Sequence, residues 1–400
     1  MTLASYRSNI FLLATAQGMF FINRYAFVAF AGLAGQMLAS DKLLATMPMA
    51  LVTAGTAAVT IPLSLMMKRT GRRPAFLLGA LSGVVGGGIC AYAVWIQSFE
   101  LLCVAALVLG TNQAASQYYR FAAIEVAPAT HLSRAISTVL AGAVIAALLA
   151  PTMARYSESL FAPATFVGGF MLIAVISVVS MIPLGLMTIP MPKENHQDAP
   201  MRPMLEIMKQ PAFAAAVMNS ACSYGLMSSV MAAAPIAMVA CGFSVSDAGS
   251  VIQWHLLAMF VPSFFTGRLV DKWGVLPILY SGLALFVIAG AFAISGIGLG
   301  HFGAAMICLG VGWNFLYVGG TTLLTEAHTP GEKAKVQGIN EFLVFGSTVI
   351  GTAVSGGLLN LVGWDAVNYG MAPFLSATLI ATLWYTFSRR GGAAAGASPA

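Results

Sequence analysis

Long apolar stretches, separated by short polar or glycine-containing loops, follow one another along almost the whole chain. A helix needs about 20 mostly apolar residues to cross roughly 30 Å of hydrocarbon, and these stretches have that length. The pattern predicts an all-α membrane protein with twelve transmembrane helices. The expected spans are residues 9–38, 44–67, 74–96, 100–124, 134–154, 164–189, 211–238, 248–267, 275–297, 301–325, 338–362 and 366–387.

One long polar connection, residues 191–210, separates the first six predicted spans from the last six. We therefore predict an N-terminal six-helix bundle over residues 1–190, a central loop on the cytoplasmic side, and a C-terminal six-helix bundle over residues 211–388. Residues 389–400 are rich in glycine and alanine and are predicted to form a disordered tail.

The composition indicates that the protein is surrounded by lipid. Hydrophobic residues make up 59% of the chain and charged residues only 8%, whereas soluble domains carry roughly 25% charged residues.

An even number of spans places both termini on one side of the membrane. Lys42 and Arg155 fall in the loops opposite the termini, and most of the 19 lysines and arginines fall on the side of the termini. The positive-inside rule therefore predicts cytoplasmic termini.

The chain also carries an internal repeat. Residues 68–73 read Lys-Arg-Thr-Gly-Arg-Arg after the second span, and residues 267–274 read Gly-Arg-Leu-Val-Asp-Lys-Trp-Gly after the eighth. A Leu-Gly pair ahead of Glu125 is likewise repeated ahead of Glu326. The repeat indicates that one six-span unit occurs twice.

Both loops resemble the signature Gly-x-Leu-x-Asp-Arg/Lys-x-Gly-Arg/Lys of the major facilitator superfamily. The second copy matches from Gly267 through Gly274, while the first has Ser64 at the glycine position and Lys68 at the aspartate position. The resemblance covers essentially the whole chain. It implies two six-helix bundles related by a pseudo-two-fold axis, with a cavity that opens alternately to either side. The gating residues that it implies are Lys68, Arg69, Gly71, Arg72, Gly267, Arg268, Asp271, Lys272 and Gly274.

The lysine at an acidic position of the first loop requires its own explanation. We hypothesise that Lys68 forms an ion pair with Glu341, or with Glu332 just before the eleventh span. The alternative is a solvated loop lysine.

Four further segments are similar to a bacterial subgroup of permeases that includes riboflavin-transporter-like members. This resemblance implies a bacterial inner membrane. The segments are residues 34–36, 119–123, 259–267 and 312–315.

Polar side chains inside the predicted spans are candidates for substrate contact, because they are costly in lipid and usually face a cavity or a partner. Arg24 lies roughly 22 Å into the first span at 1.5 Å per residue. Its side chain either contacts the substrate or helps to pack the helices. Gln113, Gln117 and Arg120 form one stripe on the fourth span, although Arg120 could instead pair with Glu125. Aromatic residues in the seventh and tenth spans suit a flat, partly polar ligand. The predicted substrate-binding residues are Gln17, Asn23, Arg24, Gln113, Gln117, Arg120, Tyr224, Trp313, Asn314 and Tyr317.

Candidates for proton coupling are few. His255 is placed inside the eighth span and has a side chain that can carry a proton, although a structural hydrogen bond is an alternative role. Glu341 lies near the cytoplasmic end of the eleventh span, and Glu125 near that of the fourth. No carboxylate occupies the middle of a predicted span.

These features predict a secondary active transporter, because the sequence contains no Gly-x-x-x-x-Gly-Lys-Ser/Thr loop for ATP. The preferred substrate is an anionic or heteroaromatic solute similar to riboflavin. The protein would move it by alternating access, coupled to protons. The alternative function is an antiporter that exports drugs or metabolites. The other classes of protein considered are a membrane-embedded enzyme and a receptor that kept the fold but lost transport. We expect no enzymatic activity, cofactor, metal or nucleic-acid partner, and a monomer in the lipid bilayer.

Overall fold

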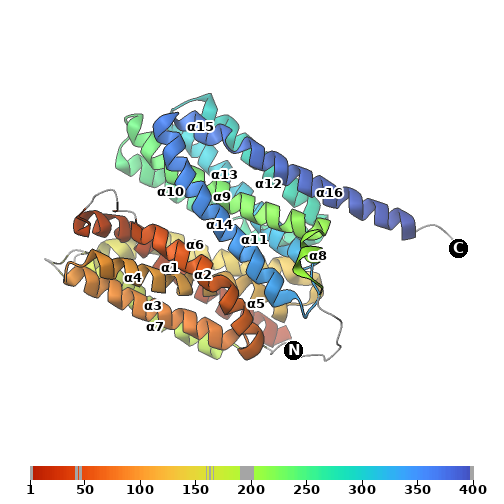
Figure 1. Ribbon diagram of the computed structural model, residues 1–400, viewed down its shortest axis with the longest axis horizontal. Coiled ribbons are helices and arrows are strands. Elements are labelled where there is room, and N and C mark those ends of the chain that lie inside the picture. The colour runs from red at the N-terminus through yellow and green to blue at the C-terminus, as the bar shows by residue number, and fades with distance from the viewer. Residues whose placement is uncertain are drawn as a thin grey trace. The chain divides into compact units, whose positions relative to one another are not determined.

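The computed structural model is helical throughout the residues that it describes (Figure 1). These are residues 3–40, 44, 47–158, 160–161, 164, 166–189 and 202–396. The first half contains α1 (Leu3–Leu38), α2 (Met47–Thr70), α3 (Arg72–Trp95), α4 (Phe99–Gln117), α5 (Tyr119–Val126), the 3-10 helix η2 (Ala129–His131), α6 (Leu132–Glu158) and α7 (Val167–Leu186). The second half contains α8 (Met204–Met208), α9 (Pro211–Ala240), α10 (Val245–Phe260), α11 (Ser263–Trp273), α12 (Val275–Ser295), α13 (Leu299–Leu324), α14 (Lys333–Leu361), α15 (Trp364–Tyr369) and α16 (Ala372–Gly396).

The helices confirm the predicted fold class of twelve transmembrane spans. Eleven segments within the described residues are long and apolar enough to cross a membrane, and α1, with 36 residues, is a further helix at the first predicted span. Three spans consist of two helices each, which the apolar pattern did not predict. The fourth breaks at Tyr118, the eighth at Pro262 and the twelfth at Gly370. At Pro262 the cause is the missing backbone N–H of proline.

The helices form two compact units, Met1–Asn195 and His196–Ala400. Their boundary falls in the segment predicted as the central loop; residues 190–201 lie outside the described residues, and the remainder contains the short helix α8. Of the segment predicted as a disordered tail, residues 389–396 belong to helix α16, and residues 397–400 lie outside the described residues. Alanine has the highest helix propensity, so an alanine-rich segment readily extends an existing helix.

Each unit is held together by the same kind of polar contact between its first and last spans. In the first unit, the Asn23 side chain of α1 donates a hydrogen bond of 2.9 Å to the Ser177 hydroxyl of α7. In the second unit, Asn219 of α9 donates a hydrogen bond of 2.9 Å to the Thr382 hydroxyl of α16. All four residues are buried. Such hydrogen bonds link helices in lipid, where no water competes for the groups.

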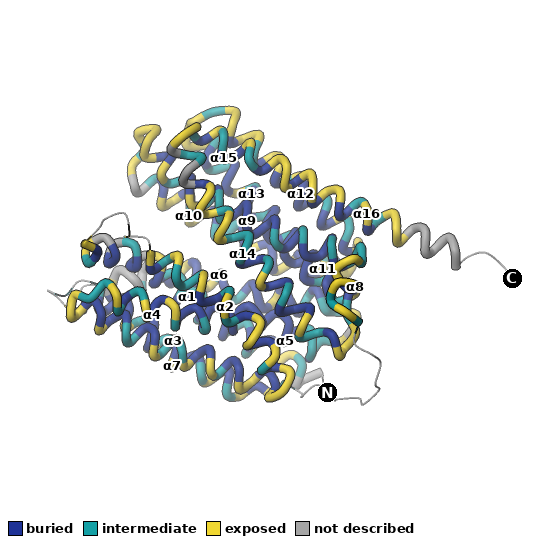
Figure 2. Tube along the Cα trace, viewed as in Figure 1, coloured by how far each residue is buried: buried dark blue, intermediate teal, exposed yellow. Residues whose placement is uncertain are grey.

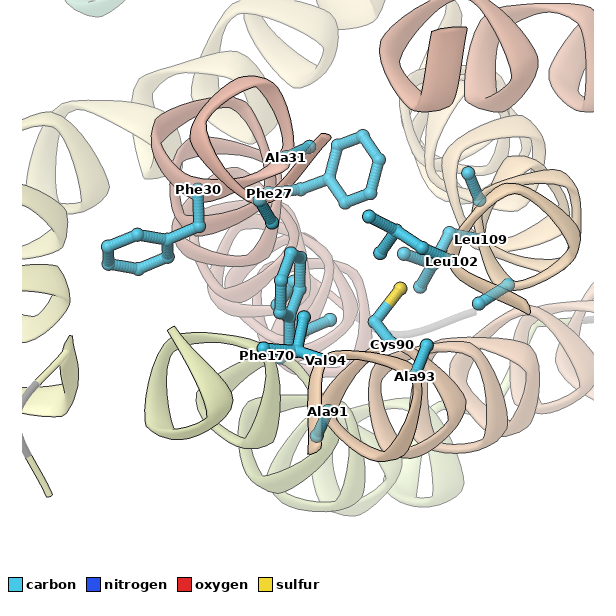
Figure 3. Packing of buried hydrophobic residues seen from close by; sticks show 14 of the residues in the cluster. Phe27, Phe30, Ala31, Cys90, Ala91, Ala93, Val94, Leu102, Leu109 and Phe170 are labelled. Atoms are coloured by element: carbon cyan, nitrogen blue, oxygen red, sulfur yellow. The ribbon is translucent and has the colours of Figure 1, made fainter. Parts of the chain in front are cut away.

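Apolar packing supplies the rest of the contacts. In the first unit, aromatic and small side chains of α1, α3, α4 and α7 meet in one cluster, with Phe27 and Phe170 edge to face at 6.4 Å (Figure 3). Exposed positions recur between buried ones along the helices (Figure 2). They include large apolar residues such as Ile145, Ile182 and Ile380, each more than 60% exposed. Lipid chains would cover these side chains.

Small residues allow two helix pairs to cross with their backbones almost touching. A side chain at Gly142 in α6 would overlap the Ala14 carbonyl of α1. In the second unit, an ideal Cβ on Gly351 of α14 would lie 2.5 Å from the Gly225 carbonyl oxygen of α9. The two crossings occupy equivalent places in the two units.

We predict that Gly351→Ala lowers the unfolding free energy by about 1–3 kcal/mol, because α9 and α14 must separate to admit the methyl group. Gly346→Ala, in the same helix, is the matched control: nothing lies within 4 Å of its ideal Cβ. That change should leave stability unchanged or raise it by about 0.5–1 kcal/mol. Thermal unfolding in detergent checks both, and equal midpoints for the two variants would contradict the crossing.

Candidate functional site

The duplicated loops have the same backbone conformation. Gly71 ends α2 and begins α3 with φ 87° and ψ 174°, and Gly274 ends α11 and begins α12 with φ 84° and ψ 169°. Each glycine N–H donates to the carbonyl four residues earlier, at 3.0 Å and 2.8 Å. This region of φ and ψ is open essentially only to glycine. The sequence repeat is therefore a structural repeat.

The charges on the two loops have different surroundings. Arg72 is buried, binds Glu125 of α5 through Nη2 at 2.7 Å and Nε at 3.0 Å, and lies over the Tyr118 ring. In the second unit Val275 follows the glycine, so this ion pair has no equivalent there. Among the other predicted gating residues, Gly267 is buried and Lys68, Arg69, Arg268, Asp271 and Lys272 are exposed. The sequence offered Glu125 as a proton-coupling group or as a partner of Arg120, and the ion pair observed here is with Arg72.

Glu332 is also held by an arginine. Its carboxylate accepts hydrogen bonds from Arg202 Nε at 2.8 Å, Arg202 Nη2 at 2.7 Å and the Thr329 backbone N–H at 2.9 Å. The guanidinium lowers the pKa of Glu332 well below its ordinary value. The Glu332 alternative in the hypothesis for Lys68 is disfavoured, because this carboxylate already has a cationic partner within its own unit.

Because the pKa of Glu332 is lowered on folding, its ion pair stabilises the protein above the unfolded pKa of about 4.3 and loses this effect as pH falls toward the folded value. We predict that Glu332→Gln costs about 1.5–3 kcal/mol at pH 7. The difference from the wild type should shrink below about pH 4. Glu206→Gln, which changes an exposed carboxylate on α8, is the control. Melting curves across this pH range test the prediction, and a difference that does not change with pH would contradict it.

Helix α1 carries three of the predicted substrate-binding residues. Gln17 and Asn23 are buried and Arg24 is half-buried. The Asn23 amide donates to Ser177, so part of its bonding capacity serves packing, while its Oδ1 has no hydrogen-bond partner among the described residues.

The predicted polar stripe of the fourth span is divided by the helix break. Gln113 and Gln117 belong to α4, and Arg120 to α5. The break lies at Tyr118, whose hydroxyl donates to the Thr60 carbonyl of α2 at 2.9 Å. Arg120 is 2% exposed and donates to Gln117 Oε1 at 3.3 Å. Its guanidinium lies 4.6 Å from the centre of the Phe121 ring.

The second unit brings three predicted residues together in an aromatic cluster. Trp313 and Tyr317 of α13 are stacked with centroids 5.0 Å apart, and Tyr224 of α9 contacts both rings edge to face at 5.2 Å and 4.8 Å. Phe260 of α10 and Phe345 of α14 extend the cluster. All five are buried.

Asn314 lies apart from this cluster. Its Nδ2 donates to the Met259 carbonyl at 2.7 Å and the Ser263 hydroxyl at 2.6 Å, and its Oδ1 accepts from Thr266 at 2.7 Å. These groups flank the break at Pro262, so the amide serves the broken span and not the aromatic face.

Two of the proton-coupling candidates are fully buried. His255 Nδ1 lies 2.7 Å from the Met306 carbonyl of α13, and because a carbonyl only accepts, Nδ1 carries the proton. Its Nε2 has no partner among the described residues. Glu341 of α14 accepts a hydrogen bond of 2.7 Å from Asn340.

Comparison with known proteins decides the family. The profile of the Major Facilitator Superfamily matches residues 13–232 and 216–398, which together span both units. The chain is a member of the Major Facilitator Superfamily. Riboflavin transporter RfnT of Brucella anthropi is 38% identical over 378 residues, which are 94% of either chain. The uncharacterized transporter YddS of Bacillus subtilis is 29% identical over 88% of this chain and 85% of its own.

Solved structures of the superfamily share the fold. The fucose:proton symporter FucP of E. coli aligns with a TM-score of 0.74 at 14% identity, over 96% of this chain and 99% of its own. A bacterial homologue of the iron transporter ferroportin in an outward-facing state aligns with a TM-score of 0.69 at 15% identity, over 94% and 98%. The twelve-span architecture predicted from the sequence is thereby confirmed.

Sequence reasoning missed several residues of these sites. Phe260 and Phe345 complete the aromatic cluster from helices that the spacing within one span could not connect. Arg202 was assigned only to the central loop. Its partner Glu332 is 130 residues away, and no local signal pairs residues at that distance.

Proposed function

We propose that this member of the superfamily is a proton-coupled secondary active transporter that imports riboflavin or a closely similar heteroaromatic solute. One observation carries the proposal: the 38% identity to a riboflavin transporter extends over 94% of both chains. Identity of this extent covers both units and the loops between their helices.

The aromatic cluster of the second unit supports a flat ring system as the substrate. Tyr224, Trp313 and Tyr317 are polar-tipped aromatics, and binding sites for drug-sized ligands are commonly lined by such residues with a few polar groups among them. The isoalloxazine ring of a flavin is a ligand of this kind.

The charges of the first unit support an anionic or neutral substrate. Arg120 is buried at the α4–α5 break and Arg24 is half-buried in α1. A cationic ligand near either guanidinium would meet like-charge repulsion that water screens only weakly inside the protein. Lipophilic cations, the usual cargo of the runner-up drug antiporter, are therefore disfavoured.

Protons provide the driving force in this proposal, with His255 and Glu341 as the groups that bind them. Glu125 is the weaker candidate, because it already forms an ion pair with Arg72. The protein works as a monomer in the bacterial inner membrane with both termini cytoplasmic, as the distribution of basic loop residues favours.

We predict that proteoliposomes holding the purified protein accumulate radiolabelled riboflavin when the outside is acidic, and that a protonophore abolishes accumulation. Trp313→Leu should raise the KM for riboflavin about tenfold. The reason is that a lost aromatic pair weakens binding by about 0.5–1.5 kcal/mol, in addition to the effect of the smaller buried apolar surface. Trp254→Leu, at a position 61% exposed on α10, is the control and should transport normally.

Two results would contradict this function. Absence of riboflavin flux in a preparation that is folded by thermal unfolding removes the substrate. Proton-driven extrusion of lipophilic cations by the same preparation would favour the drug antiporter instead.

A further inference from the structure

Two buried polar atoms of α13 have no hydrogen-bond partner among the described residues. They are the indole Nε1 of Trp313 and the hydroxyl Oγ1 of Thr321. Both side chains have no exposed surface. They lie on either side of Tyr317 at positions four residues apart, so the three form a row along one face of the helix.

Thr321 departs from a rule that other helical threonines of this chain follow. In a helix, a threonine hydroxyl commonly donates to the carbonyl four residues earlier. The adjacent Thr322 does so at 2.9 Å, and the hydroxyl of Thr321 does not. Others that follow the rule are Thr15, Thr53, Thr60, Thr378, Thr382 and Thr386.

Trp313 departs from the ordinary behaviour of buried tryptophan in a similar way. A buried indole N–H usually finds an acceptor, and the buried Trp364 donates to the Ala293 carbonyl at 2.9 Å. The Trp313 ring is fixed by Tyr224, Tyr317 and Phe260. These neighbours provide ring contacts and leave Nε1 without an acceptor.

Packing distinguishes these two atoms from a third buried hydroxyl on the same pair of helices. Ser220 of α9 also has no partner, but its Oγ lies 2.5 Å from the ideal Cβ position of Gly320. The backbone of α13 therefore closes off this hydroxyl. Gly312 and Gly319 place the opposite side of α13 against α12. Neither Trp313 nor Thr321 is among the nearest contacts of these glycines.

We propose that Trp313 Nε1–H and Thr321 Oγ1 form hydrogen bonds to the transported ligand and select its polar groups. The proposal rests on the function proposed above and names the chemistry that the site recognises. The ligand must present an acceptor to the indole N–H and a second polar group about 12 Å along the helix, at 1.5 Å per residue. A planar heteroaromatic with ring carbonyls at one edge and a hydroxylated side chain meets both requirements. Riboflavin has this construction.

Both atoms are covered in this structure, so the ligand reaches them in a conformation that opens this face of α13. Alternating access provides such a conformation. The unpartnered groups destabilise the ligand-free covered state, and a ligand that bonds to them removes this penalty. The polar atoms therefore favour ligands with matching groups over apolar rings of the same shape.

The test measures ligand-free stability and riboflavin affinity in the same variants. Thr321→Val keeps the shape of the side chain and removes the hydroxyl. It should leave the melting temperature unchanged or raised, because an unsatisfied buried group is lost, and should weaken the Kd for riboflavin about three- to tenfold. Ser220→Ala, the matched control, should also leave the melting temperature unchanged or raised, but should keep the wild-type Kd. Thr321→Ser retains the hydroxyl and should bind as the wild type does.

Each other outcome overturns a specific statement. Wild-type protein that binds no riboflavin overturns the proposed substrate, and the assignment of these two atoms with it. Riboflavin binding that Thr321→Val leaves unchanged overturns the assignment while the proposed function stands. Equal weakening in Thr321→Val and Thr321→Ser shows that the methyl group and its packing matter, and likewise overturns the hydrogen bond.

Discussion

The structure depends on one constraint: inside a bilayer no water is available, so polar groups must find their partners within the protein. The asparagine contacts of the two units meet this constraint between helices. Asn314 meets it at the break caused by Pro262, where three hydrogen bonds surround one amide. The same requirement explains why the buried guanidinium of Arg72 comes with the carboxylate of Glu125. In this fold the same contacts pack the helices together and give their buried polar groups hydrogen-bond partners.

A buried polar group that lacks a partner within the protein needs its own explanation. A buried donor or acceptor without a partner costs stability, and a ligand or a proton from outside the chain is one way to supply the missing bond. Nε2 of His255, Nε1 of Trp313 and Oγ1 of Thr321 are exceptions of this kind within the described second unit. A proton can satisfy the histidine, and a ligand with polar edges can satisfy the other two.

The sequence predicted the spans well, because span length and hydropathy are set by bilayer thickness and need no tertiary information. The repeated glycine loops were also predictable, since their conformation requires glycine. Contacts between distant segments were not: nothing local joins Arg202 to Glu332. Asn314 was predicted to bind substrate together with Tyr317, but two positions three apart on a helix share only a broad face. Only the neighbouring break at Pro262 decides where the amide points.

Duplication and divergence divide the work between the two units. The scaffold is the same in both: a glycine of positive φ after the second span, a backbone crossing at small residues, and an asparagine bonded to the last span. The chemistry is not repeated. The first unit buries Arg120, and the second buries the aromatic cluster with His255 and Glu341. Under the function proposed above, the ligand has no two-fold symmetry, so two identical halves could not both match it. The positions at which the two units differ are therefore the ones to examine for specificity.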